Sequence, residues 1–389
     1  MSPSALFVTT VPITLELFLT PFAEHFRAAG WRVDALANGA TQNAAIHGAF
    51  DNRYDITWSR NPLNPSDLFD TWARVRRVVI EGCYDVVHVH TPIAAFMTRY
   101  ALRALPTADR PAIIYTTHGF HFYQGQGLLG WIAYRTLERI AAPWTDYLVT
   151  INREDYEAAR RLGSIPVDNV RYIPGIGVDT ARFDSRAVRP EAARAVREDL
   201  GIPGEAFMLT MVAEFAPVKR HAHVLDALGM VADDNVILLL VGEGALEPVT
   251  RQSVTEAGMT DRVRFAGYRT DVPAVLAASD ALVLASHREG LPRSVLEAMA
   301  SGIPIIGTAT RGIVDAVGDT AGWIVPKHDA TALARAIETA AAGRDEARRR
   351  GEAGRERARS EFSLERVMAA HDRLYREALE LRRERLATT

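Results

Sequence analysis

Two glutamates, Glu289 and Glu297, carry the strongest chemical signal in the sequence, with seven residues between them. An apolar strand-like run precedes Glu289, Pro292 suits the first position of a helix, and Gly302 suits the helix end. Glu289 therefore falls in the loop before a short helix, and Glu297 lies little more than one turn inside it. The free N–H groups and positive dipole end at residues 291–294 can bind phosphate or sugar hydroxyls. The sequence thus predicts one ligand for both carboxylates and the helix start.

A purely structural role for Glu297 is the alternative. Ser294 and Glu297 also match a capping box, in which the glutamate satisfies backbone N–H groups. Two features favour the ligand instead. The helix is short and lies between two buried apolar runs, and Glu289 occupies the kind of loop in which parallel sheets bind ligands.

Histidines form a second group of candidates. His118 follows a buried run in a loop with Gly119 and several aromatic residues, and this location favours a functional role. For His121, a functional role and a purely structural role are equally favoured. A metal site of His88, His90, His118 and His121 is the less favoured interpretation, because no carboxylate or cysteine lies beside the His-x-His pair at ligand spacing. Packing and loop hydrogen bonds are the favoured role of this pair.

The elements that must position these residues alternate between strand-like and helix-like runs along the whole chain. Buried runs, each followed by a helix, predict an α/β fold with two parallel sheets covered on both faces. The expected strands are Ala5–Val11, Arg32–Ala37, Asp85–Thr91, Ala112–Thr117, Tyr147–Ile151, Val170–Ile173, Phe207–Ala213, Val236–Val241, Val263–Phe265, Ala281–Ala285, Pro304–Gly307 and Gly322–Val325.

A proline- and glycine-rich segment, Ile173–Asp179, separates the two halves and suits a hinge. We expect two Rossmann-like domains, residues 1–180 and 181–364, with a cleft between the carboxyl ends of their strands. The region from about Arg344 is rich in Arg, Glu and Ala and predicts solvated helices with i,i+4 pairs. A C-terminal helix of about residues 365–385 is expected to pack back on the first domain.

Bulk properties exclude several classes of protein. The chain has 389 residues, a net charge of −3 and one cysteine, Cys83, which argues against nucleic-acid binding, a disulfide framework and a cysteine-based zinc site. No signal peptide and no apolar stretch of ~20 residues is apparent. We expect a cytoplasmic protein that at most contacts the inner face of a membrane.

Aromatic and basic residues that cluster near one predicted helix raise the question of membrane contact. They are Trp131, Tyr134, Arg135, Arg139 and Trp144. Such side chains can rest on a lipid surface. A core stripe with long side chains reaching to solvent is the more common arrangement, and we favour it. The pair Gly242-Glu-Gly244 lacks the third glycine of a dinucleotide fingerprint, since Glu247 stands in its place, so NAD binding is only weakly indicated.

The segment around Glu289 and Glu297, framed by Gly-Leu-Pro and Ala-Met-Ala-Ser-Gly-Ile-Pro, resembles the E-x7-E signature of family 4 retaining glycosyltransferases, which have the GT-B fold. Further matching segments are Val241–Gly244, Val263–Arg269 with Asp271-Val-Pro, Thr310–Gly312 and Gly322–Pro326. In the first half, His88–Pro92 and Thr116–Tyr123 resemble a bacterial subgroup that builds surface polysaccharides and lipid-linked oligosaccharides.

The resemblance implies roles for individual residues on the donor side. Glu297 would bind the ribose hydroxyls, Glu289 the transferred sugar, and Lys219 the diphosphate, with Arg220 as a helper. Tyr268 and Arg269 would line the nucleobase pocket. The remaining implied donor-binding positions are Gly242, Gly290, Leu291, Pro292, Arg293 and Ser294.

On the acceptor side, the resemblance makes His118 the active-site histidine near the sugar and the acceptor. His121, Phe120 and Tyr123 would lie beside the acceptor. The chain also departs from the family pattern. Ala213-Glu214 replaces a common Gly-Arg, so an expected phosphate-binding arginine is missing, and Thr9–Thr14 replaces an N-terminal Gly-Gly loop.

The reaction expected from this resemblance is transfer of a hexose-type unit from a nucleoside diphosphate, with UDP as the expected nucleotide, to a hydroxyl of a glycan or lipid-linked saccharide. Retention of the anomeric configuration is implied. The chain lacks Asp-x-Asp, the usual cation carrier of the other glycosyltransferase fold, so we expect no catalytic metal and no cofactor. Two alternatives stay open: a nucleotide-sugar epimerase of the same architecture, and a degenerate partner subunit, suggested by Glu214.

Overall fold

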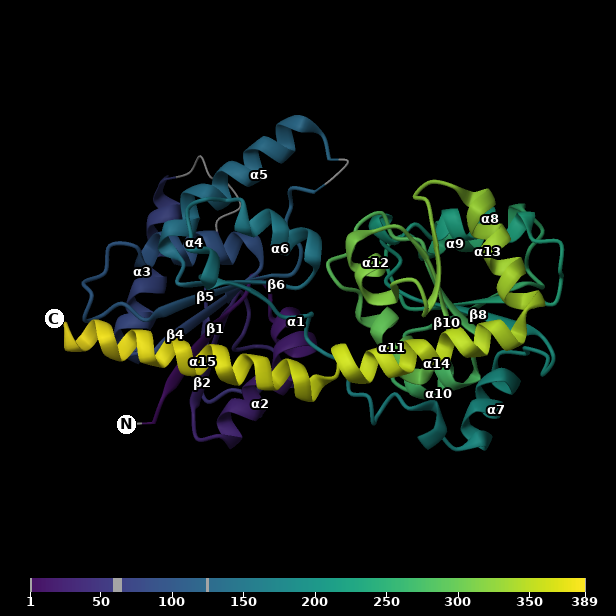
Figure 1. Cartoon of the computed structure of the whole chain (residues 1–389), viewed down its shortest axis with the longest axis horizontal. Helices are drawn as coiled ribbons and strands as arrows, with labels where there is room; N and C mark the ends of the chain where they lie inside the picture. Colours follow the sequence, from purple (N-terminus) through teal and green to yellow (C-terminus); the bar gives the residue numbers. More distant parts are fainter. Residues whose placement is uncertain (1, 59–64, 124–125, 389) are drawn as a thin grey trace. The chain divides into compact units, whose positions relative to one another are not determined.

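A computed structural model describes residues 2–58, 65–123 and 126–388 (Figure 1). The chain divides into two compact units. The first unit comprises Met1–Ile176 together with Val367–Thr389, and the second unit comprises Gly177–Arg366. The division falls between Ile176 and Gly177, inside the proline- and glycine-rich segment, and the end of the chain belongs to the first unit.

The described part of the first unit forms a seven-stranded parallel sheet in the order β3-β2-β1-β4-β5-β6-β7. The strands are β1 (Ser4–Val8), β2 (Arg32–Ala37), β3 (Arg53–Asp55), β4 (Val86–His90), β5 (Ala112–Thr117), β6 (Tyr147–Thr150) and β7 (Val170–Tyr172). Strands β1, β4 and β5 are buried along their whole length, which explains their continuous apolar runs. Six of these strands were predicted. The short edge strand β3 was missed because its residues are only half-buried and carry no apolar run.

Helices cover this sheet and carry the chain from strand to strand. They are α1 (Pro12–Thr14), α2 (Thr20–Ala28), α3 (Pro65–Gly82), α4 (Pro92–Leu102), α5 (Leu128–Ala141), α6 (Arg153–Arg160) and α15 (Leu364–Ala387), with a π-helical turn at Leu15–Leu19 between α1 and α2. Within the described parts of the chain, no helix combines the length and the apolar character that a bilayer span requires.

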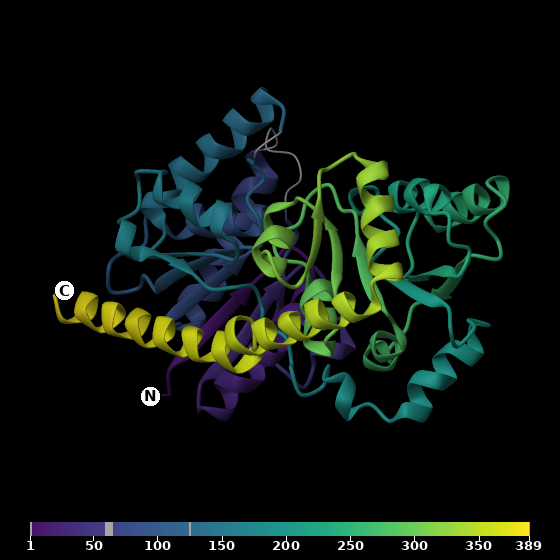
Figure 2. The same ribbon diagram turned by 45° about the vertical axis from the view of Figure 1, so that its right-hand side comes forward.

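The C-terminal helix α15 packs against α2 and the sheet of the first unit, as both ribbon views show (Figures 1 and 2). Tyr375 stacks on Phe26 with ring centroids 4.2 Å apart, and its hydroxyl bonds to His88 Nδ1 at 2.8 Å. Glu377 pairs with Arg171 at 2.7 Å. These contacts place the last helix of the chain on strands that lie far away in the sequence.

The second unit contains a six-stranded parallel sheet in the order β10-β9-β8-β11-β12-β13. Its strands are β8 (Phe207–Val212), β9 (Val236–Val241), β10 (Val263–Gly267), β11 (Ala281–Leu284), β12 (Ile305–Thr308) and β13 (Gly322–Val325). Its helices are α7 (Pro190–Asp199), α8 (His221–Met230), α9 (Glu247–Glu256), α10 (Val272–Ala278), α11 (Arg293–Ser301), α12 (Arg311–Val317), α13 (Ala330–Ala342) and α14 (Arg344–Glu361). The six strands match the predicted runs to within a few residues.

Each sheet has a switch point at which the strand order reverses. In the first unit it lies between β1 and β4, and in the second between β8 and β11. In open parallel sheets the loops after such a strand pair diverge and leave a crevice at the carboxyl ends. The loops after β8 and β11 are therefore the first place to look for a ligand site in the second unit.

Candidate functional site

The loops after β8 and β11 hold the predicted lysine and the first predicted glutamate side by side. Lys219 ends a short 3-10 turn, Pro217–Lys219, in the loop after β8, and Glu289 lies in the loop after β11. The two loops are tied together because the His287 N–H donates to the Val218 carbonyl at 2.8 Å. Lys219 Nζ donates to Glu289 Oε1 at 2.7 Å. The switch point thus carries a fixed cation–carboxylate pair.

This pair is largely withdrawn from water. The Glu289 side chain is 10% exposed and that of Lys219 is 24% exposed. A charge-assisted hydrogen bond at this depth is stronger than one at the surface and orients both side chains. The Glu289 carbonyl also accepts from Arg311 Nε at 3.3 Å, which links its loop to the start of α12.

Glu297 lies on α11 as a buried carboxylate. Helix α11 begins at Arg293, one residue later than predicted, and Pro292 is the N-cap with extended backbone and not the first helical residue. Among the described residues, neither Ser294 nor any other side chain caps this helix, and Glu297 is too far along it to close a capping box. The capping-box role considered for Glu297 is therefore wrong. The predicted helix end at Gly302, in the left-handed region with φ of 77°, is confirmed.

The environment of Glu297 leaves its carboxylate strongly desolvated. The residue is 7% exposed, and its Oε1 accepts from Arg293 Nε at 2.7 Å. Burial raises the pKa of Glu297, and the nearby Arg293 guanidinium partly opposes this shift. A buried carboxylate with few protein partners suits a ligand that supplies hydroxyl donors.

Two glycines, Gly312 and Gly242, allow loops at the carboxyl ends of the second sheet to pack closely against one another. A Cβ on Gly312, at the start of α12, would stand 2.2 Å from the Gly290 carbonyl oxygen and 2.9 Å from Leu291 Cα. A Cβ on Gly242 would stand 2.2 Å from the Ala213 carbonyl oxygen. Gly242 thus packs the loop after β9 against the loop after β8.

The remaining predicted donor residues occupy varied environments. Arg220 has a positive φ of 56°, and its Nη1 lies 2.6 Å from His328 Nδ1. Tyr268 is 69% exposed, so its ring is available for stacking, whereas Arg269 pairs with Asp271 at 2.6 Å. Pro292 is buried, and Leu291, Arg293 and Ser294 are half-buried. Glu214 is exposed in the loop after β8.

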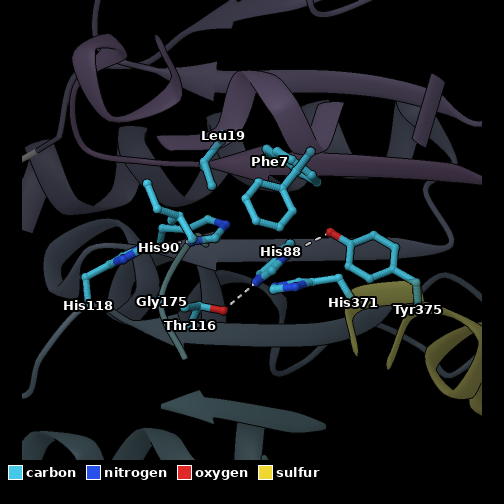
Figure 3. Close-up of a pocket in the computed structure, with 11 residues that line it drawn as sticks. Phe7, Leu19, His88, His90, Thr116, His118, Gly175, His371 and Tyr375 are labelled. Carbon is cyan, nitrogen blue, oxygen red and sulfur yellow. Dashed lines mark hydrogen bonds between the residues drawn. The ribbon is translucent and has the colours of Figure 1, made fainter. Parts of the chain in front are cut away.

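Four histidines line a small cavity in the first unit (Figure 3). His88 and His90 lie on β4, His118 follows β5, and His371 comes from α15. His90 Nδ1 and His118 Nε2 are 3.1 Å apart. Burial lowers the pKa of His118 and of His371 to about 4, and it also lowers the pKa of His88 and His90. All four rings are therefore neutral at physiological pH.

His88 is fully committed to hydrogen bonds. Its Nδ1 lies 2.8 Å from the Tyr375 hydroxyl, and its Nε2 lies 2.7 Å from the Thr116 hydroxyl (Figure 3). Metal ligation by His88 would break one of these bonds. Across the described residues, no group of three or more potential ligands is arranged to hold a metal ion.

The three predicted acceptor-side residues have different surroundings. Phe120 is 1% exposed and belongs to the core, where it stacks on Phe122 at 4.5 Å. The His121 ring lies 5.3 Å from that of Tyr134 on α5. Tyr123 lines an open groove of about 560 Å³ between α5 and α6. His121 and Tyr123 thus border α5, whereas the Phe120 ring faces the core.

Helix α5 exposes an apolar face that was not predicted. We expected a core stripe, and Trp131 and Trp144 are indeed partly buried. The aliphatic residues of the helix, however, are turned to solvent. The exposed fractions are 70% for Leu128, 85% for Leu129, 47% for Ile132, 45% for Leu137 and 49% for Ile140. The expected core stripe thus holds for Trp131 and Trp144, whereas Tyr134 is 41% exposed. The leucines and isoleucines of this helix were not part of that expectation.

Two residues of the histidine cluster, His371 and Tyr375, were not predicted at all. They lie on α15, in a segment rich in Arg and Glu that gave no sign of a buried face beyond ordinary helical spacing. Both are at most 5% exposed. Only the fold brings them to His88, which precedes Tyr375 by 287 residues.

Comparison with known proteins places the chain in a family. A family model described as Glycosyltransferase Family 4 matches residues 15–182, and one described as Glycosyl transferases group 1 matches residues 193–357. The chain is 32% identical over 361 residues to EpsD of Bacillus subtilis, a putative glycosyltransferase. The aligned residues make up 92% of each protein. It is 30% identical over 234 residues, 59% of each protein, to the UDP-Gal:alpha-D-GlcNAc-diphosphoundecaprenol alpha-1,3-galactosyltransferase of Escherichia coli.

A solved structure shares the fold over nearly the whole chain. HepE of Anabaena, crystallised in complex with UDP, superposes with a TM-score of 0.80 at 20% sequence identity. The superposition covers 97% of this chain and 100% of the HepE chain. Together with the two matched family models and the EpsD relative, this likeness leads to one conclusion. The chain belongs to the family 4 glycosyltransferases and has the GT-B fold.

Proposed function

We propose that this glycosyltransferase transfers a sugar from a UDP-sugar to a hydroxyl of a glycan or lipid-linked saccharide in cell-envelope polysaccharide synthesis. We include retention of the α-anomeric configuration and independence from a metal ion in the proposal. The observation that carries it is the Lys219–Glu289 pair at the β8/β11 switch point, with buried Glu297 on the adjoining helix. The UDP in the HepE complex and the UDP-galactose in the name of the Escherichia coli relative support the nucleotide.

The residues of the second unit suggest how the donor would be activated. The positive charge of Lys219 would stabilise the departing diphosphate as the glycosidic bond lengthens. The uncapped start of α11 would add backbone N–H groups and the positive end of the helix dipole. Glu289 would accept hydrogen bonds from the transferred sugar, and Glu297 from the ribose hydroxyls. The acceptor hydroxyl would attack from the face that the nucleotide leaves, with the donor phosphate taking its proton.

The proposed acceptor is supported by relatives and by the surface of the first unit. The Escherichia coli relative is named for an undecaprenol-linked acceptor. Leu129, Ile132, Leu137 and Ile140 share one side of α5 at helical spacing and are exposed. An exposed apolar helix face with arginines on the same helix, Arg135 and Arg139, suits the boundary of an anionic bilayer. We therefore propose peripheral contact with the inner face of the membrane through α5.

Nucleotide binding tests the donor half of the proposal. Thermal unfolding is measured with UDP, GDP, ADP and their sugars, with EDTA present throughout. A ligand at ~100 times its Kd should stabilise the protein by about 2.7 kcal/mol. We expect a shift with UDP or a UDP-sugar that survives EDTA. No shift with any nucleotide would contradict the proposed donor site.

Product analysis separates the competing activities. NMR of the product of the stabilising donor and a hydroxyl acceptor gives the anomeric configuration, and retention requires the α-anomer. Conversion of the donor to an epimer without any acceptor would favour the epimerase. Donor binding without transfer or hydrolysis would favour a degenerate subunit.

Liposome flotation tests the membrane contact. Leu129→Asp combined with Ile132→Asp should abolish binding to vesicles that contain anionic lipid. Val249→Asp is the matched control, since Val249 is 60% exposed on α9 of the second unit. Equal flotation of both variants would refute a role for α5.

A further inference from the structure

The His90–His118 contact fixes more than the position of two rings. His90 is 2% exposed on β4, and the edge of Phe7 packs on its ring with centroids 6.1 Å apart. The His88 ring also contacts it, with ring centroids 4.1 Å apart, and lies 5.8 Å from the Phe7 ring. These neighbours hold the His90 ring with its Nδ1 3.1 Å from His118 Nε2.

A neutral imidazole carries one N–H, so the surroundings decide which nitrogen holds it. His90 Nε2 is buried and has no hydrogen-bond partner among the described residues. An N–H on this atom would be an unsatisfied buried donor, which native structures tolerate less well than an unsatisfied acceptor. The proton is therefore better placed on Nδ1, where it donates to His118 Nε2 at 3.1 Å.

The proton position on His90 also determines the tautomer of His118. If its Nε2 accepts from His90, the single proton of the neutral His118 ring must be on Nδ1. His118 is then a hydrogen-bond donor at Nδ1 and has no second N–H. Because burial keeps the ring neutral well below pH 7, this donor does not change with pH in the physiological range.

We propose that His90 is a positioning residue that holds His118 in the Nδ1–H tautomer, so that His118 meets the sugar or the acceptor as a neutral hydrogen-bond donor. The inference rests on the proposed function of His118 and names the partner that prepares it. A residue that only fills space at position 90 would leave the tautomer of His118 open.

Two substitutions of His90 separate tautomer control from packing. His90→Asn places an amide nitrogen near the position of Nδ1 and retains a donor toward His118. His90→Leu has a similar volume and no donor. His47→Asn is the control, because His47 is exposed in the first unit. Melting temperatures of all variants show which of them fold.

The tautomer is measured directly by NMR of protein labelled with ¹⁵N and ¹³C in histidine, with the His118 signals assigned from their loss in His118→Gln. We expect the Nδ1–H form in the wild-type protein and in His90→Asn, and the Nε2–H form or a mixture in His90→Leu. An Nε2–H form of His118 in the wild-type protein would overturn the inference, whether or not any variant folds.

Kinetics supply the second readout. Loss of one correctly oriented donor should lower kcat of His90→Leu about 5- to 10-fold and leave KM for the donor nearly unchanged. His90→Asn should recover most of this loss. Equal kcat values for the asparagine and leucine variants would overturn the inference. Absence of transfer by the wild-type protein would contradict the proposed function, and the NMR result would then decide the inference alone.

Discussion

Replacing Glu297 by glutamine separates its cost to folding from its contribution to binding. The carboxylate is 7% exposed, and burial raises its pKa above the ordinary value of 4.5. A raised folded-state pKa means that the stability linked to this group is fully present below pH 4.5 and is lost as pH rises through the folded value. At neutral pH the ionised Glu297 therefore lowers the free energy of unfolding relative to a neutral side chain at this position.

Glutamine keeps the shape of the side chain and removes the charge. Arg293, the partner of Glu297, is 40% exposed and stays hydrated after the change. We therefore expect the free energy of unfolding of Glu297→Gln at pH 7 to equal or exceed that of the wild-type protein. Removal of a structurally required buried ion pair partner would have the opposite effect, with a loss of about 3–5 kcal/mol.

The effect on nucleotide binding follows from the hydrogen bonds that the charge would accept. A hydrogen bond to a charged group contributes about 1.5–3 kcal/mol. Loss of the charge opposite the ribose hydroxyls should therefore raise Kd for UDP roughly 10- to 150-fold. Glu297→Gln would then be a variant that folds at least as well and binds much more weakly.

Calorimetric titration with UDP and urea unfolding at pH 7 measure the two quantities on the same samples. Glu356→Gln is the matched control, because Glu356 is an exposed glutamate on α14 of the same unit, and both quantities should stay at their wild-type values. Unchanged UDP affinity of Glu297→Gln would refute the ribose-binding role. A loss of stability of about 3 kcal/mol or more would show that the carboxylate serves the fold.

Three further outcomes test other parts of the argument. Lys219→Met leaves a buried carboxylate without its cation, so we expect about 1–3 kcal/mol lower stability in urea unfolding and about 100-fold slower transfer; wild-type rates would remove the lysine from the mechanism. Gly312→Ala places a Cβ 2.2 Å from the loop before α11 and should weaken UDP binding roughly 10- to 100-fold in calorimetry, whereas Gly229→Ala, with Met259 Sδ at 3.9 Å, should bind normally. Stability in urea should fall as pH drops from 6.5 to 4, because the unfolded chain takes up protons that His118 and His371 refuse in the fold; each shift to about 4 corresponds to roughly 3 kcal/mol, and a flat profile would contradict neutral burial.

The donor side was predictable because its information is local. A buried run, a proline, a glutamate in the loop and a glycine at the helix end fix β11, α11 and β12 within one stretch of sequence. The positions of Glu289 and Glu297 on these elements follow from backbone periodicity alone. The pairing of Glu289 with Lys219 was not predicted, because it depends on the strand order, which puts β8 beside β11 and brings their loops together.

What could not be predicted depends on contacts between segments far apart in sequence. Helix α14 was expected to be a solvated face, and i,i+4 pairs such as Glu346–Arg350 are present. Arg355 on the same helix is nevertheless buried, and its Nη2 donates to the Ser301 carbonyl at the end of α11 at 2.7 Å. An arginine that satisfies the last carbonyls of another helix looks, in sequence, like any arginine in a charged helix.

Glu214 stands where the family pattern has a phosphate-binding arginine, and its surroundings indicate which other groups could bind the diphosphate. Arg220 was expected to help bind the diphosphate, and either it replaces the missing arginine or diphosphate binding is weaker. Its Nη1 lies 2.6 Å from His328 Nδ1, and its backbone is in the left-handed region. Glu214 itself is exposed, so solvent and salt screen its charge. In the proposed donor site, Lys219 and the start of α11 would then carry a larger share of diphosphate binding than Arg220. The ammonium group of Lys219 lacks the planar two-pronged geometry of an arginine guanidinium, so donor orientation in this chain should depend more strongly on Glu289 and Glu297.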